Sequence, residues 1–219
     1  MSRKRIAQLL VVLLAGLIAA TALPSAAGAH TAGSYFVRGH WPANQSIGYG
    51  VNTGFPGGEY RSRLLDGKNQ WNNAANTGEP NIYWSLADDI SYGTAGSPCG
   101  VPGYNTAAIF WNDLDYLSSG TLGATRLCGS TSVIFNFTIE FDSDRSWYTG
   151  TGDSPDNRPD FWSIASHEFG HAVGFWNHLP AGECPNNSTK FTMCPTYDMG
   201  TERQRTLTAH DIHTFDAAY

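Results

Sequence analysis

The stretch of sequence that decides the fold is His167-Glu168-Phe169-Gly170-His171-Ala172-Val173-Gly174. On an α-helix, His167 and His171 stand one turn apart on the same face, so both imidazoles can bind one zinc ion. Glu168 lies about 100° further round the helix, where it is poorly placed to bind the metal but can accept a proton from a water that the metal polarises. The spacing therefore predicts a zinc site with Glu168 as its catalytic base.

Two glycines distinguish this stretch from an ordinary amphipathic helix, on which the same pentapeptide can arise by chance. Gly170 and Gly174 each disfavour a helix by about 1 kcal/mol relative to Ala. Gly174 is explained if the chain turns there through a positive φ and returns a third ligand to the metal. His178 follows in the sequence and is the candidate for that ligand.

The segments around the motif predict an α+β fold. We expect strands over residues 46–51, 81–86 and 133–142, a loop over 93–105, and helices over 60–76, over 160–173 and from 208 onward. Asp160 is the expected N-cap of the second helix, and Thr208 with Asp211 forms a capping-box-like pair at the start of the third.

Residues 133–142 show the clearest strand pattern. Four apolar side chains alternate there with four polar ones, namely Phe135, Phe137, Ile139 and Phe141 with Asn136, Thr138, Glu140 and Asp142. This period of two predicts a strand with one buried face and one face in water.

The first 29 residues have the pattern of a secretory signal peptide. A basic head at residues 3–5 precedes an almost wholly apolar run over residues 6–22, and Ala27-Gly28-Ala29 supplies small residues for cleavage before His30. A retained membrane anchor is the alternative, because the apolar run approaches spanning length. The small residues and the lack of a charged stop favour removal. We therefore expect a secreted, extracellular protein with one domain, residues 30–219, and no membrane segment after cleavage.

The mature chain is acidic. Without the three basic residues of the head it holds 10 Lys and Arg against 19 Asp and Glu, a formal charge of −9. An acidic protein with no basic cluster is a poor candidate for binding nucleic acid or anionic lipid. Nothing in the sequence requires more than a monomer.

Four cysteines lie in the exported part, at Cys99, Cys128, Cys184 and Cys194. In an oxidising compartment they predict two disulfides, for which three pairings exist. Proximity in the sequence favours Cys99–Cys128 and Cys184–Cys194. A second metal site is less favoured, because no two of the cysteines form a Cys-x-x-Cys pair.

Residues 167–174 resemble the long zinc motif of the metzincins, and within them of the matrixins, the matrix metalloproteinase family. Met193-Cys194-Pro195-Thr196-Tyr197 is similar to the methionine-bearing turn beneath the zinc of that family. Residues 207–219 resemble its closing helix, and residues 139–147 resemble the strand and turn that lead to its active-site helix. The likeness spans most of the mature chain and is specific over roughly its last 80 residues, where several motifs occur in order.

The resemblance implies a metzincin-like catalytic domain, in which a twisted mixed sheet carries an active-site helix and a C-terminal helix. It implies a zinc endopeptidase that cleaves extracellular polypeptides with one catalytic zinc. Pro195 and Tyr197, in the segment that begins at Met193, would line the pocket for the side chain that follows the cleaved bond. Residues 121–127 would be the edge strand along which a substrate peptide lies.

Several residues depart from the family pattern. The family's third histidine comes three residues after the glycine, where this chain has Asn177, and His178 is one residue late. Imidazole is a better zinc ligand than a neutral amide, and Asn177 or a water is the alternative to His178. No histidine lies between His40 and His167, so we do not expect the family's structural zinc.

The segment around Cys99 is similar to the family's inhibitory propeptide switch, but it lacks the preceding arginine and lies inside the catalytic domain. Calcium could bind through Asp153, Asp156 or Asp160, although no full oxygen-ligand pattern is present.

Two other functions stay open from the sequence alone. The first is a secreted binding protein that keeps the scaffold without turnover, against which an intact Glu168 argues. The second is a zinc amidase that acts on cell-wall peptides, which shares the ligands and differs in the shape of its cleft.

Overall fold

The computed structural model describes residues 39–42, 46–75, 83–90, 107–130, 132–175, 178, 184, 191–197 and 199–217. The predicted signal peptide, the predicted loop over residues 93–105, Cys99 and Asn177 lie outside these residues.

Five described strands form one mixed sheet, in the order β2-β1-β3-β5-β4. Neighbours among β1 (Ser46–Asn52), β2 (Tyr83–Ile90), β3 (Ala107–Asn112) and β5 (Ile134–Asp142) run parallel. The edge strand β4 (Gly123–Gly129) pairs antiparallel with β5. The mixed sheet of an α+β fold is confirmed, and β1, β2, β4 and β5 each overlap a segment that the sequence predicts to be a strand.

Strand β3 has no counterpart among the predicted elements. Its first four residues, 107–110, are all buried, and β3 lies between β1 and β5 in the sheet. A central strand that is buried on both faces is apolar without alternation, and so short an apolar run cannot be distinguished by its period from part of a buried helix.

The prediction that the polar side of β5 faces water is wrong. Its four polar side chains are each at most 3% exposed, whereas Phe135 is 65% exposed. Glu140 accepts a hydrogen bond from Tyr116 Oη at 2.7 Å, and Asp142 forms an ion pair with Arg145 at 2.6 Å. Such partners offset the cost of burying a charge, and they come from segments that the strand pattern does not include.

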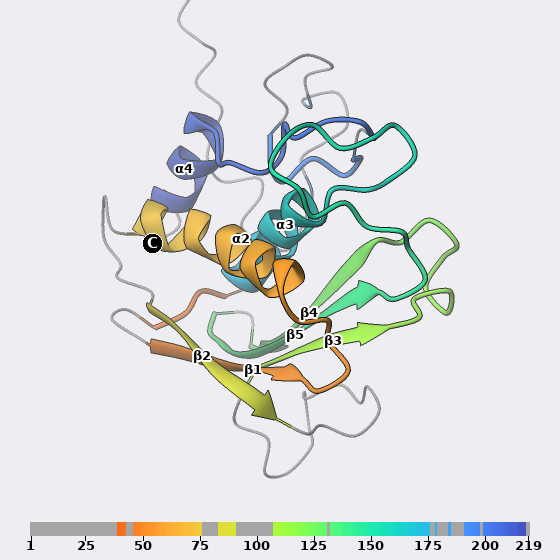
Figure 1. Ribbon diagram of the computed structural model, residues 1–219. Coiled ribbons are helices and arrows are strands. Elements are labelled where there is room, and N and C mark those ends of the chain that lie inside the picture. The colour runs from red at the N-terminus through yellow and green to blue at the C-terminus, as the bar shows by residue number, and fades with distance from the viewer. Residues whose placement is uncertain are drawn as a thin grey trace, which may run out of the picture. The chain divides into compact units, whose positions relative to one another are not determined.

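Helices α2 (Glu59–Ala75) and α3 (Phe161–Ala172) lie on the same side of the sheet (Figure 1). They approach closely at Gly67, where an added Cβ would lie 2.7 Å from the backbone nitrogen of Ser166. A third helix, α4 (Ala209–Asp216), follows near the end of the chain. All three correspond to predicted helices.

Aromatic rings fix α3 against the sheet. The ring centroid of Phe161, the first residue of α3, lies 4.8 Å from that of Phe141 and 5.3 Å from that of Trp147. Further along the helix, Phe169 lies 5.8 Å from Tyr49 of β1. Each such pair adds about 0.5–1.5 kcal/mol beyond the apolar area that it buries. The helix that carries the histidine motif is therefore held at both ends.

Both predicted helix caps are present. The carboxylate of Asp160 accepts a hydrogen bond from the backbone nitrogen of Ser163 at 2.8 Å, which caps α3. At α4, Thr208 and Asp211 form the reciprocal capping box. The same Asp211 carboxylate accepts a hydrogen bond from the backbone nitrogen of Thr192 at 3.3 Å, so it links α4 to the residue before Met193.

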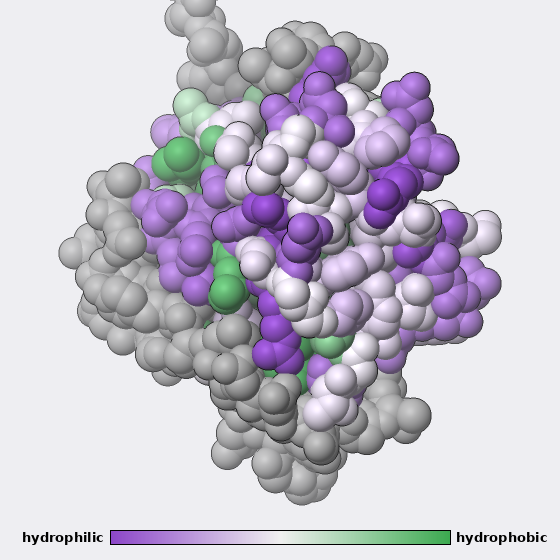
Figure 2. Space-filling view, viewed as in Figure 1, coloured by the Kyte–Doolittle hydropathy of each residue, from purple (hydrophilic) through white to green (hydrophobic). Residues whose placement is uncertain are grey.

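The described surface seen in Figure 2 is mostly hydrophilic, and its hydrophobic residues form small separate areas. Within the described residues, no helix has the length and apolar character needed to cross a membrane.

Candidate metal centre

Three histidine side chains converge at one point. The Nε2 atom of His167 lies 3.1 Å from that of His171 and 3.1 Å from that of His178, and the last two atoms are 3.2 Å apart. Among the described residues this is the one group of three or more metal-ligating side chains. The three candidate ligands from the sequence are therefore brought together, and Asn177 is outside the described residues.

The outer nitrogens of two rings are held by backbone carbonyls. His167 Nδ1 lies 2.7 Å from the oxygen of Thr192, and His171 Nδ1 contacts the oxygen of Phe175. Because a carbonyl oxygen can only accept, Nδ1 carries the hydrogen in both rings and Nε2 presents a lone pair when the ring is neutral. Burial lowers the pKa of His167 well below its usual value and that of His171 to about 4, so both rings are neutral at pH 7.

This arrangement fits a zinc ion. Two lone pairs that point at each other across 3.1 Å repel unless a cation lies between them. Zinc takes neutral imidazole nitrogens at about 2.0–2.1 Å, a distance compatible with three nitrogens that are this close to one another. The carbonyl partners on Nδ1 fix the tautomer and the orientation of the rings, as is usual for zinc-binding histidines.

Gly174 provides the turn that the sequence predicts. Its φ is +121°, in the region that favours glycine. Beyond the end of α3, the backbone nitrogen of Gly174 donates to the oxygen of His171 at 2.9 Å, and that of Phe175 donates to the oxygen of Gly170 at 3.1 Å. The chain thus reverses after the helix, and His178 comes back to the two helical histidines.

Glu168 is buried against the first residues of strand β4. Its side chain accepts a hydrogen bond at Oε2 from Thr125 Oγ1, at 2.7 Å. Its other oxygen, Oε1, is next to Gly123, where an added Cβ would lie at 2.7 Å. Burial raises the pKa of Glu168 to about 7, and the Thr125 hydrogen bond acts in the opposite direction. A carboxylate with a pKa near neutrality is suited to proton transfer.

Met193 packs directly against the helix that carries the histidines. It is 1% exposed, and a Cβ at Gly170 would clash with its sulfur and lie 2.7 Å from Trp71 Cζ2. The glycine inside the motif is therefore explained by packing: it leaves room for Met193 and Trp71 against α3. Next to Met193, Cys194 forms the predicted disulfide with Cys184.

A cleft of about 310 Å³ opens beside the histidines and Glu168. Residues 120–123, which lead into β4, line one part of it, and the two candidate pocket residues Pro195 and Tyr197 line another. Ile164 and Gln204 also line the cleft and are not among the residues predicted from the sequence. Ile164 could have been found, because it precedes His167 by three residues on the same helix face. Gln204 has no local signal.

The remaining candidate residues are not brought to this centre. Asp153 and Asp156 are exposed, and Asp160 is fully buried in an ion pair with Arg205 at 2.7 Å. The described residues therefore show no carboxylate cluster for calcium. The predicted Cys99–Cys128 bond includes a residue outside the described part of the chain and stays a prediction.

Comparison with known proteins adds one finding. The sequence model of the matrixin family matches residues 119–219, a range that contains β4, α3, the three histidines, Met193 and α4. No curated protein matches the chain.

Proposed function

Because this chain belongs to the matrixin family of zinc metalloendopeptidases, we propose that it is secreted and cleaves exported or extracellular polypeptides, with Glu168 as the general base. The observation that carries this proposal is the meeting of three histidine Nε2 atoms and a buried carboxylate at one cleft.

His167, His171 and His178 are the residues that would hold the zinc. When bound, zinc supplies a Lewis acid that polarises a carbonyl and lowers the pKa of water to about 7. The protein's part is to present neutral imidazoles in fixed orientations, which the carbonyls of Thr192 and Phe175 achieve through hydrogen bonds to Nδ1.

Glu168 would move the proton. Thr125 donates to Oε2, so Oε1 is the atom that accepts a proton from the attacking water. Oε1 then passes this proton to the nitrogen of the leaving amine, which restores the carboxylate. The lack of a side chain at Gly123 lets the Glu168 carboxylate lie directly against β4, because a Cβ there would lie only 2.7 Å from Oε1.

The substrate would bind as an added strand. β4 is at the end of the sheet, with β5 as its neighbour on one side, so its other edge can pair with an extended peptide. The side chain after the cleaved bond would enter the cleft between residues 120–123 and the wall formed by Pro195 and Tyr197.

Export would be directed by residues 1–29, which would be removed before His30. The Cys184–Cys194 disulfide supports an oxidising compartment. We propose a monomer, since neither the acidic charge nor the described surface calls for a partner. The proposal does not include calcium, because Arg205 occupies the carboxylate of Asp160.

The exported protein tests the proposal. Mass spectrometry of the protein recovered from the medium is expected to give His30 as its first residue, and metal analysis about one zinc per chain. Casein and a mixed peptide library are expected to be cleaved at internal bonds. Zinc binding without cleavage of any protein or peptide would instead favour a binding protein, and cleavage of cell-wall peptides alone would favour an amidase.

Thr125→Val is expected to lower kcat roughly 10-fold, because a hydrogen bond to a charged group contributes about 1.5–3 kcal/mol and here holds the base in place. Zinc content and KM should stay near those of the parent. Thr125→Ser keeps the hydroxyl and is the matched control, with a kcat near the parent value. An unchanged kcat in the valine variant would mean that Thr125 does not position Glu168.

A further inference from the structure

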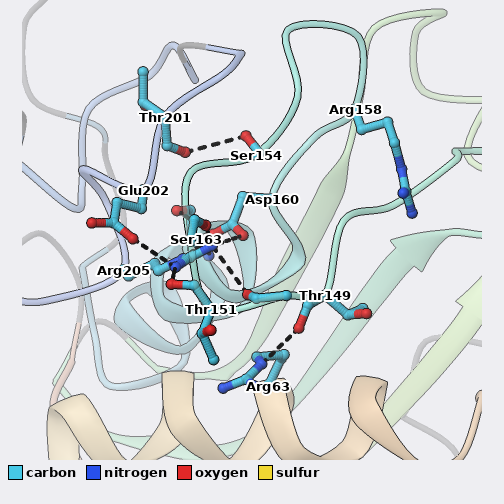
Figure 3. A network of polar contacts seen from close by, with 12 residues as sticks. Arg63, Thr149, Thr151, Ser154, Arg158, Asp160, Ser163, Thr201, Glu202 and Arg205 are labelled. Atoms are coloured by element: carbon cyan, nitrogen blue, oxygen red, sulfur yellow. Dashed lines mark hydrogen bonds and ion pairs between the residues drawn. The ribbon is translucent and has the colours of Figure 1, made fainter.

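Arg205 is a buried cation outside the metal centre. Its side chain is 3% exposed, and it faces Asp160, whose side chain is 0% exposed. Two parallel hydrogen bonds join them, from Nε to Oδ2 at 2.9 Å and from Nη2 to Oδ1 at 2.7 Å. This is the bidentate geometry that a guanidinium forms with a carboxylate. Figure 3 shows the pair within a larger polar network.

The rest of the guanidinium binds a loop and a second carboxylate. Nη1 donates to the oxygen of Thr151 at 2.6 Å and to Glu202 Oε2 at 2.8 Å. Nη2 donates to the oxygen of Gly152 at 2.7 Å and lies 3.2 Å from that of Gly150. All five N–H groups of the side chain therefore have partners. A lysine has three donors at one point and could not satisfy the same set.

The network extends to the cleft through Asp160. Its carboxylate caps α3 through Ser163, and its backbone nitrogen donates to Tyr197 Oη at 2.9 Å. Tyr197 Oη in turn donates to the oxygen of Thr201 at 3.0 Å. Tyr197 lines the cleft. Asp160 therefore binds Arg205 through its carboxylate and Tyr197 through its backbone nitrogen.

The backbone oxygen of Arg205 and the side chain of the residue before it make further contacts. The oxygen of Arg205 accepts a hydrogen bond from Ser166 Oγ at 2.8 Å, one residue before the first zinc-binding histidine of α3. The preceding residue, Gln204, lines the cleft, and its amide nitrogen lies 3.5 Å from the oxygen of Thr192. Residues 195–207 contain neither helix nor strand among those described, so these side-chain bonds hold the segment in place.

We propose that Arg205 is a positioning residue for substrate selection. Its guanidinium holds the wall formed by Pro195 and Tyr197, together with Gln204, against the start of α3, and so sets which side chain the cleft accepts. This inference rests on the proposed function in one respect, that the cleft receives a side chain of the substrate. The buried Arg205–Asp160 pair suits this role, because water does not screen the interaction. Each N–H group of the guanidinium has a hydrogen-bond partner, and together these bonds fix the geometry of the pair.

The test compares Arg205→Lys with the parent on peptides that differ only in the residue after the cleaved bond. The readout is the ratio of kcat/KM between the preferred side chain and alanine. In Arg205→Lys this ratio is expected to fall about 10-fold, the scale on which small changes in a pocket alter discrimination, with zinc content unchanged. Simple destabilisation would lower the rate on both peptides equally and leave the ratio as it was.

Two further variants complete the experiment. Arg203→Ala, at an exposed position in the same segment, is the control and is expected to keep the parent ratio. Arg205→Ala leaves Asp160 buried without its cation, and its melting temperature is expected to fall by roughly 10 °C. Added guanidinium ion, at concentrations too low to denature the parent, is expected to restore part of that loss.

A parent-like ratio in Arg205→Lys, with full zinc, would overturn the inference. If the parent itself cleaves no peptide, the proposed function fails and a second readout decides on Arg205. Amide hydrogen exchange of residues 149–154 and 195–202 is then expected to be faster in Arg205→Lys than in the parent. Equal exchange in the two proteins would show that Arg205 does not hold the wall.

Discussion

Glu168→Gln is expected to bind zinc as the parent does and to cleave peptides about 10²–10⁴-fold more slowly, the range attributed to a general acid or base. Glutamine has the shape of glutamate, and its amide oxygen can still accept the hydrogen bond from Thr125. It cannot take a proton from water at neutral pH. The loss should therefore appear in kcat, measured on a fluorogenic peptide, while metal analysis shows full zinc.

Two comparisons show whether this loss reflects proton transfer. Glu168→Asp keeps the carboxylate but withdraws it by one methylene, so its kcat is expected to lie between those of the parent and the glutamine variant. Asp115→Asn removes an exposed carboxylate and should leave kcat unchanged. A glutamine variant that keeps zinc and cleaves at the parent rate would exclude Glu168 as the base.

The parts of the fold that the sequence predicts well depend on neighbouring residues. Asp160 caps α3 through Ser163, three residues away, and Thr208 pairs with Asp211 over the same distance. The spacing of His167 and His171 likewise depends on one turn of helix. In each case the partners are close in the chain, so the local pattern contains the whole interaction.

The parts that the sequence does not predict depend on distant partners. Glu140 can be buried on the polar side of β5 because Tyr116, 24 residues earlier, donates a hydrogen bond to its carboxylate. Gln204 comes to the cleft because Arg205 is bound to Asp160, 45 residues earlier. The sequence does not predict strand β3 for a related reason, since its lack of alternation arises from elements that cover both of its faces. A pattern within a short stretch of sequence cannot predict contacts between residues that are far apart in the chain.

His178→Ala is expected to weaken zinc binding by more than about 100-fold and to abolish cleavage at ordinary zinc concentrations. Loss of a direct ligand should exceed the 10–100-fold effect that is typical of residues that only support a ligand. Asn177→Ala, at the neighbouring position, is the matched control and is expected to keep both zinc and activity. Zinc affinity, measured by competition with a chromophoric chelator, distinguishes the two. The reverse result would make Asn177 the third ligand.

The exposed position of His178 allows its contribution to zinc binding to be separated from any contribution to folding. His167 is 8% exposed and its ring is bonded to Thr192, so its removal would disturb the core as well as the metal. His178 is exposed, and within the described part of the chain its ring contacts the other two histidines. Without zinc, the parent and His178→Ala should therefore melt at the same temperature. With zinc at 100 times its Kd, the parent should gain about 2.7 kcal/mol of stability, and the variant much less. A variant that is less stable without zinc would show instead that His178 supports the fold, and its loss of activity would then not identify it as a ligand.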